Sequence, residues 1–293
     1  MQHNLCADRA RVFGAYLVGL GAAFLIGYIL RDHHPLLVAA VADLAGTATV
    51  FAFSVAWNNS SVYDPYWSVA PIPIALYWAW HGSSGRAPGL RETVLLTLLV
   101  VWGVRLTANW VRRWKGMSDE DFRYRTIRER SGSLYWPASF VSIHLMPTIW
   151  VFLGMLSVHF ALTHLDPPVG WLTIAAGMVT LSAIAIEWLS DRQLASFLRS
   201  RADPQAVLET GLWSWSRHPN YFGEVLFWWG MYLFGLDAAP DKWWTIAGPV
   251  SITILFAFIS VPWMDRRMLT RHPDYQRRLE RVSGLVLWPP RRP

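Results

Sequence analysis

The chain has 293 residues, of which 53% are hydrophobic and only 16% charged, against roughly 25% charged residues in a soluble domain. This composition excludes an ordinary soluble globule and indicates a polytopic membrane protein. The net charge of +6 does not imply a nucleic-acid partner, because the cations lie in loops between apolar segments, where membrane topology explains them. The single cysteine, Cys6, excludes an intrachain disulfide and a cysteine-ligated zinc site.

Eight apolar segments follow in chain order, each about long enough to cross a membrane as a helix. They lie near 11–30, 36–56, 66–81, 92–111, 138–162, 169–189, 221–236 and 243–263, and the third and seventh are short. A backbone in lipid must satisfy its own hydrogen bonds, so the segments are expected to be helices. The sequence therefore predicts an all-α fold, a polytopic transmembrane helix bundle of seven or eight spans, forming one membrane-embedded domain over 1–293.

The loops between the segments differ in charge. Residues 112–130, the 190–217 loop and the tail after Trp263 are rich in arginine, whereas 163–169 has no Lys or Arg and 237–242 has only Lys242. The positive-inside rule places the arginine-rich loops in the cytoplasm. We expect an integral membrane protein of a bacterial inner membrane, with both termini cytoplasmic if there are eight spans. The long first segment has no small-residue cleavage site and is interpreted as a retained span.

The segment from 57 to 71 places an acid among phenols at the mouth of an apolar helix. Asp64 lies between Tyr63 and Pro65, and Tyr66 follows. Burial would raise the pKa of this carboxyl and keep it protonated, so Asp64, Tyr63 and Tyr66 are the candidate catalytic residues. The alternative is a loop in which Asp64 only caps the helix that begins at Pro65.

Cations near the cytoplasmic end of the fourth apolar segment form a second candidate. Arg105 lies inside the apolar run, one turn from Trp102 and Asn109, and Arg125 follows in the next loop. An intramembrane arginine must reach a partner or the interface, so it is a functional candidate by default. The alternative is that Arg105 only extends to the membrane surface.

The stretch from 211 to 236 combines cations, a helix start and an acid one turn inside an apolar run. Free N–H groups at a helix start bind anions, and arginines bind phosphates in a bidentate manner. With two acids and an arginine upstream, the candidate binding residues are Glu187, Asp191, Arg199, Arg217, His218, Asn220, Tyr221 and Glu224. The alternative is a salt-bridge network that clamps two helix ends.

A metal site is not expected. His159 and His164 are five residues apart, which is not the i, i+4 pair of a helical metal site. Nor does the chain contain a Walker loop or a Rossmann glycine fingerprint, so a nucleotide would have to bind among membrane helices.

The motifs SRHPNYFGE and LFWWG, with EWLSDRQL upstream and a WPP ending, resemble the steroid 5-alpha-reductase superfamily, in particular a large bacterial branch of it. Characterised members are multi-span membrane enzymes that use NADPH to reduce a carbon–carbon double bond conjugated to a ketone. The resemblance implies that Asn220 and Glu224 contact the nicotinamide end of NADPH. It implies further that Glu187 and Asp191 lie near the adenosine part and Arg105 near the phosphates.

The resemblance also aligns Asp64 with a glutamate that works with a tyrosine to hold the substrate ketone. The tyrosine of the superfamily would fall near Trp102, which has no phenolic proton. Either Tyr63 or Tyr66 substitutes for it, or the substrate differs from that of the superfamily. We therefore expect spans 11–111 to form the substrate side, and spans 138–263 with their basic loops the cofactor side. The expected partners are a hydrophobic steroid or lipid enone and membrane lipid, and a monomer is compatible with the sequence.

Two other function classes remain open. RHPNYFGE also resembles the signature of isoprenylcysteine carboxyl and phospholipid methyltransferases, which bind S-adenosylmethionine. A non-enzymatic lipid-binding scaffold is the third class, and it predicts that neither cofactor binds.

Overall fold

The structure is a computed structural model that describes residues 5–83, 85–164, 169–203, 205–272 and 274–291. Over these residues the protein is all-α, as predicted, with one isolated parallel bridge between Ser216 and Ser283. The chain divides into two compact units, Met1–Met155 and Leu156–Pro293. Each unit is described below by itself, and the prediction of a single domain over 1–293 stays a prediction.

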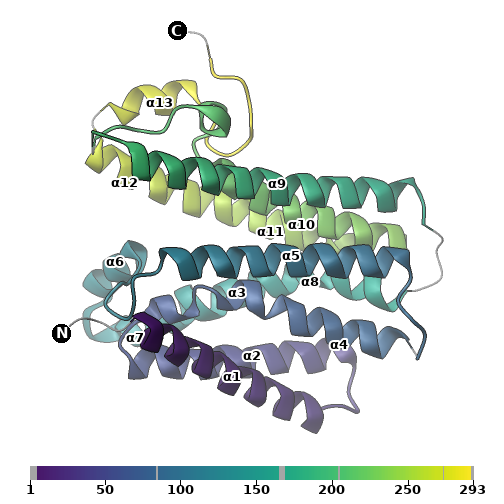
Figure 1. The fold of residues 1–293 in the computed structure, drawn as a ribbon. Coiled ribbons are helices and arrows are strands. Elements are labelled where there is room, and N and C mark those ends of the chain that lie inside the picture. The colour runs from purple at the N-terminus through teal and green to yellow at the C-terminus, as the bar shows by residue number, and fades with distance from the viewer. Residues whose placement is uncertain (1–4, 84, 165–168, 204, 273, 292–293) are drawn as a thin grey trace. The chain divides into compact units, whose positions relative to one another are not determined.

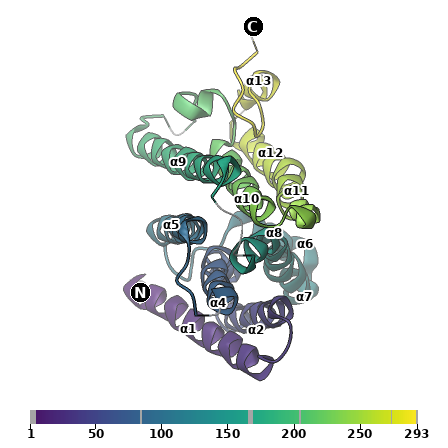
Figure 2. The same ribbon diagram turned by 90° about the vertical axis from the view of Figure 1, so that its right-hand side faces the viewer.

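The first unit consists of helices joined by short polar turns (Figure 1). In order they are α1 (Leu5–Ile29), α2 (Pro35–Ala56), η1 (Ser60–Tyr63), α3 (Tyr66–Val69), α4 (Pro71–Ser83), α5 (Leu90–Arg113), α6 (Phe122–Ser131), η2 (Gly132–Leu134), α7 (Tyr135–Ser139), the π-helical η3 (Phe140–Leu145) and α8 (Met146–Thr163), whose last residues lie in the second unit. Figures 1 and 2 show α1 and α2 side by side along their length.

Local sequence explains several helix starts in this unit. Pro35 stands in the first turn of α2, where its missing N–H costs nothing, and the His34 ring accepts from the Leu36 N–H. Asp121 caps α6 by accepting from the Arg123 N–H at 2.8 Å. Two helices of the first unit, α2 and α6, therefore begin at residues that suit a helix N-terminus.

The second unit contains the remaining helices. They are α9 (Trp171–Ser200), η4 (Gly211–Ser214), α10 (Pro219–Ala238), η5 (Pro240–Ile246), α11 (Ala247–Ile254), the π-helical η6 (Leu255–Ser260), α12 (Val261–Arg271) and α13 (Tyr275–Arg281). As expected from the motif, α10 begins at a proline directly after His218.

Glycines allow α9 and α10 to pack closely, as both ribbon views show (Figures 1 and 2). A Cβ added at Gly223 would lie 2.9 Å from the carbonyl of Ala183, and one added at Gly230 would meet the side chain and backbone of Thr180. Small residues of this kind let helix backbones approach each other in membranes. Twelve of the 20 residues of α10 are buried.

Six helical stretches among the described residues are long and apolar enough to cross a membrane: Leu5–Ile29, Pro35–Ala56, Leu90–Arg113, Phe122–Thr163, Trp171–Ser200 and Pro240–Arg271. The protein is therefore an integral membrane protein, but the predicted count of seven or eight spans is not confirmed. The predicted span at 66–81 is divided between α3 and α4, and the 13 residues of α4 rise only about 20 Å. The other missing span, 221–236, lies in α10, which carries Asn220 and Glu224 and is not among the six stretches.

Candidate functional site

The segment between α2 and α3 is a compact polar turn. After Trp57, Asn58 adopts a positive φ of 51°, a conformation that asparagine tolerates better than most residues. The Asn59 side chain then caps η1 by accepting from the Ser61 N–H at 2.8 Å. Asn59, Ser60 and Ser61 are all buried.

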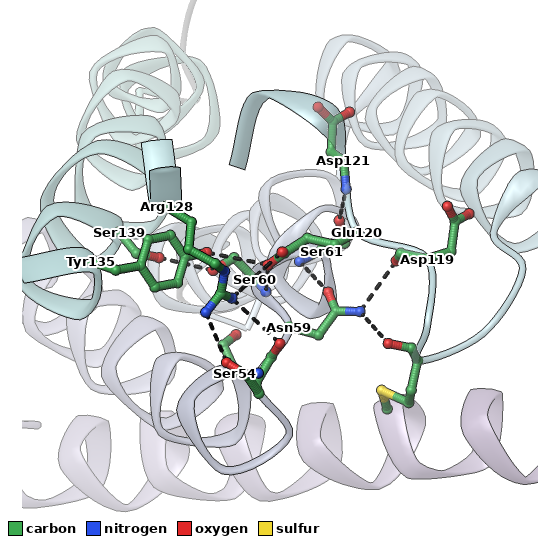
Figure 3. A network of polar contacts seen from close by, with 12 residues as sticks. Ser54, Asn59, Ser60, Ser61, Asp119, Glu120, Asp121, Arg128, Tyr135 and Ser139 are labelled. Carbon is green, nitrogen blue, oxygen red and sulfur yellow. Dashed lines mark hydrogen bonds and ion pairs between the residues drawn. The ribbon is translucent and has the colours of Figure 1, made fainter. Parts of the chain in front are cut away.

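A second chain segment, 115–139, satisfies the polar groups of this turn (Figure 3). The Asn59 amide donates to the carbonyls of Met117 and Asp119 at 2.8 and 3.2 Å. The Ser60 N–H donates to Glu120 at 2.9 Å. Buried polar groups must be paired, so these bonds fix the turn against residues about 60 positions away.

Glu120 is the centre of the network in Figure 3. It accepts from Arg128 at 3.1 Å and from the Tyr135 hydroxyl at 3.2 Å. The guanidinium of Arg128 also lies 3.8 Å from the centre of the Tyr135 ring, a cation–π contact. Ser60 completes the network, 2.6 Å from the Tyr135 hydroxyl and 2.9 Å from that of Ser139. The network holds α6 and α7 beside the turn that carries Asp64.

Asp64 is partly buried, and α5 and α6 each contribute one donor to it. The Tyr124 hydroxyl donates to Oδ1 at 2.5 Å, and the Trp110 indole N–H lies 3.4 Å from Oδ2. Burial, and secondly the neighbouring Asp121 carboxylate, raise the pKa of Asp64 to about 7, against the lowering effect of the Tyr124 hydrogen bond. Asp64 can therefore exist with or without a proton near neutral pH.

The two tyrosines predicted to assist Asp64 direct their hydroxyls elsewhere. The hydroxyl of Tyr63 lies 2.6 Å from that of Thr148, and Tyr66 donates to Asp43 at 3.0 Å. Their catalytic role stays a prediction. The phenol that the structure brings to Asp64 is Tyr124, which the sequence analysis did not select. The sequence shows that Tyr124 lies within the arginine-rich segment 112–130. It does not show that Tyr124 pairs with Asp64, because the two are 60 residues apart along the chain.

The two predicted cofactor arginines of the first unit lie on different helices. Arg105 is partly buried on α5, one turn from the fully buried Trp102, and Arg125 is exposed on α6. Their contact with cofactor phosphates stays a prediction.

In the second unit, two predicted cofactor acids are buried, at Glu187 on α9 and Glu224 on α10. Gly223 lets α10 approach Glu187 so closely that an added Cβ would lie 2.8 Å from the glutamate Cβ. Glu224 accepts from the Trp228 indole at 2.8 Å. The predicted residues Asp191, Asn220 and Tyr221 are partly exposed, and Arg199 is exposed.

Arg217 and His218 meet at Asp265 of α12. Arg217 donates to both carboxylate oxygens of Asp265, at 3.2 and 2.8 Å, and His218 Nε2 lies 3.0 Å from Oδ1. Tyr275 donates to the same oxygen at 3.0 Å. Arg217 further donates to the carbonyls of residues 279 and 282. The structure therefore gives Arg217 and His218 an anchoring role, and their contact with a cofactor stays a prediction.

Among the described residues, no group of three or more His, Cys, Asp or Glu side chains could hold a metal ion.

The His218 and Tyr221 rings stack nearly parallel, with their centres 5.3 Å apart, and this contact fixes the orientation of the imidazole at the start of α10.

The sequence profile of the DUF1295 family, described as a protein of unknown function, matches residues 50–282. A protein of Schizosaccharomyces pombe described as uncharacterized is 24% identical over 254 residues, covering 79% of this chain and 68% of the relative. No solved structure matches the chain. The matched range includes Asp64 with Tyr124, and Asp265 with its partners Arg217, His218 and Tyr275. The chain belongs to the DUF1295 family.

Proposed function

We propose that the protein is an NADPH-dependent reductase of the carbon–carbon double bond of a steroid-like or other lipid enone. The resemblance of SRHPNYFGE and LFWWG to the steroid 5-alpha-reductase superfamily suggests this class. The single structural observation that supports it is the pair formed by Asp64 and Tyr124, a carboxyl and a phenol 2.5 Å apart at a partly exposed position.

Reduction of an enone adds a hydride to the β carbon and a proton to the α carbon, and the carbonyl oxygen carries the developing negative charge. NADPH supplies the hydride when bound. The Asp64–Tyr124 pair can donate a hydrogen bond to that oxygen, which stabilises the enolate-like charge. Because the pKa of Asp64 is raised to about 7, a share of the Asp64 carboxyls is protonated at neutral pH and can serve as this donor.

The residues predicted to hold NADPH fit it unequally. Asn220 and Tyr221 are partly exposed at the start of α10 and offer an amide and a phenol, which suit the carboxamide and hydroxyl groups of the cofactor. Arg217 fits a phosphate less well, because four of its contacts already go to Asp265 and two carbonyls. We therefore place most of the predicted cofactor binding on Asn220, Tyr221 and Glu224.

Turnover by the purified protein tests the proposal. The protein in detergent is mixed with deuterium-labelled NADPH and a panel of steroid and linear lipid enones, and products are analysed by mass spectrometry. The proposal expects one deuterium at the β carbon and one solvent hydrogen at the α carbon. Methyl transfer from S-adenosylmethionine to a lipid substrate, with no reduction of any enone, would contradict it and support the methyltransferase alternative.

A further inference from the structure

The last described residues of the second unit, 282–291, form a bent loop, here called the strap, that the rest of the unit holds in place. The Arg217 N–H donates to the Ser283 carbonyl at 2.8 Å, next to the bridge between Ser216 and Ser283. The Trp288 N–H donates to the Trp215 carbonyl at 3.2 Å. Figure 1 shows the strap and α13 at the end of the unit where α9 and α12 finish.

Gly284 lets the strap lie directly on this end of the unit. A Cβ at this position would be 3.1 Å from the Arg217 guanidinium and 3.3 Å from the side chain of Val261. The Ser216 hydroxyl also donates to the Leu285 carbonyl at 2.8 Å. The strap is therefore a fixed part of the unit at least as far as Trp288.

The strap presents an apolar face to the outside. Leu285 and Leu287 are partly buried, whereas Val286 and Trp288 between and beyond them are 49% and 68% exposed. Trp215, 49% exposed, is bonded to the strap at Trp288. The exposed apolar residues therefore lie close to one hydrogen bond and are not scattered singly, and a gathered apolar surface marks an interaction site.

The position of the strap along the helices corresponds to a membrane surface. It packs on Val261, and Arg217 ties it to Asp265. The candidate span Pro240–Arg271 changes from apolar to charged at this point, since Met264 is followed by Asp265 and then Arg266. The strap therefore packs on this candidate span where its apolar part ends.

Exposed cations lie on α13 and at the end of the strap. Arg277 and Arg281 on α13 and Arg291 at the end of the strap are exposed, and the Arg291 N–H donates to the Arg281 carbonyl at 2.9 Å. Glu280, an exposed acid on the same helix, is hydrogen-bonded to Gln276 at 3.2 Å. Tryptophan beside arginine is the composition that binds the headgroup region of an anionic leaflet.

We propose that Trp215, Val286 and Trp288 form a lipid anchor that inserts into the headgroup region of an anionic leaflet, with Arg277, Arg281 and Arg291 contacting lipid phosphates. Two features favour a bilayer over a protein partner. The strap packs where the apolar part of a candidate span ends, and α13 and the end of the strap carry the charge opposite to that of anionic lipid.

Spin labelling tests the anchor. Cys6→Ser removes the single cysteine, and Val286→Cys then carries a nitroxide label, with Gln276→Cys on exposed α13 as the matched control. Both proteins are reconstituted into vesicles of equal parts phosphatidylcholine and phosphatidylglycerol. We expect oxygen to collide with the label at 286 several-fold more often than a water-soluble nickel chelate does, and the reverse at 276.

Two further measurements separate the lipid from other occupants. Arg277→Gln combined with Arg281→Gln should reduce the oxygen preference at 286 in the anionic vesicles to the level seen in pure phosphatidylcholine. A label at 286 as accessible to nickel as the control would overturn the anchor. A label shielded from both reagents in vesicles and in detergent would also overturn it, because a protein contact would then cover the surface. An oxygen preference at 286 that does not change with the two arginine substitutions would overturn it as well.

Discussion

Asp64 differs from a simple helix-capping aspartate in its surroundings. A cap receives backbone N–H groups, whereas Asp64 receives a phenol from Tyr124 and an indole from Trp110. The indole belongs to α5 and the phenol to α6. The polar network around Glu120 holds α6 in place. The geometry therefore gives the carboxyl a fixed proton partner, which a capping role does not need.

The pair should be required for turnover and not for cofactor affinity. We expect Asp64→Asn to lower kcat for enone reduction by about 100-fold or more, the usual size of a general acid–base contribution, with NADPH affinity unchanged. Tyr124→Phe should have a smaller effect in the same direction. Tyr28→Phe, at an exposed tyrosine, is the matched control and should be silent. Loss of NADPH affinity with kcat preserved would make Asp64 structural.

The raised pKa of Asp64 also makes stability depend on pH in a definite direction. In the unfolded chain an aspartate loses its proton near pH 3.9, whereas in the native protein the pKa is about 7. Between these values the native state binds more protons, so this group's contribution to stability falls as pH rises from about 4 to about 7. Thermal midpoints in detergent should follow this slope, and Asp64→Asn should flatten it. An identical slope in both proteins would show that Asp64 titrates normally.

Single residues were predictable where the reason is local. Asp64 stood out because an acid between tyrosines at the start of an apolar helix is unusual, and Pro219 because a proline suits the first turn of α10. Tyr124 and Asp265 were missed because their partners lie 60 and 48 residues away. Hydrophobic period and capping signals report on neighbours within a few residues and contain no information on such pairs.

At the scale of elements, the contact between α9 and α10 depends on glycine. Gly230→Ala should destabilise the second unit by about 1–3 kcal/mol, because the added methyl meets the backbone of Thr180, which cannot rotate away. Gly21→Ala on α1, where nothing lies within 4 Å, is the matched control and gains the same helix propensity without the clash. Denaturation in detergent measures both. Equal stability of the two variants would show that the helices are not in close contact.

The attachment of the C-terminal tail to Arg217, just before α10, is a second element-scale feature. Asp265→Asn leaves Arg217 without its carboxylate partner, and breaking such a mostly buried pair costs about 3–5 kcal/mol. We expect trypsin to cleave the variant faster at the arginines of α13, because the tail is released. Asp274→Asn, at an exposed acid beside α13, should leave the cleavage rate unchanged. Equal rates in both variants would remove the anchoring role of Asp265.

At the scale of the whole molecule, the all-α fold and most helix positions followed from apolar segment length alone. The number of spans did not. Segment 66–81 is interrupted at Ala70, which separates α3 from α4, and average hydrophobicity does not reveal such a break. α10 is long enough to span but polar at its start, where the predicted cofactor residues lie. The apolar pattern nevertheless located this helix, because the predicted segment 221–236 lies within α10.

The measurement that tests the central claim most directly is thermal stabilisation of the purified protein by NADPH and by S-adenosylmethionine. A ligand that binds only the native state stabilises it by about 2.7 kcal/mol at 100 times its Kd. We predict that NADPH alone stabilises the protein. The stabilisation should be lost in Asn220→Ala and in Glu224→Gln, and the second change keeps an acceptor for the Trp228 indole. It should be retained in Glu129→Ala, a control at an exposed residue. Stabilisation by S-adenosylmethionine alone, or by neither ligand, would contradict the proposed reductase.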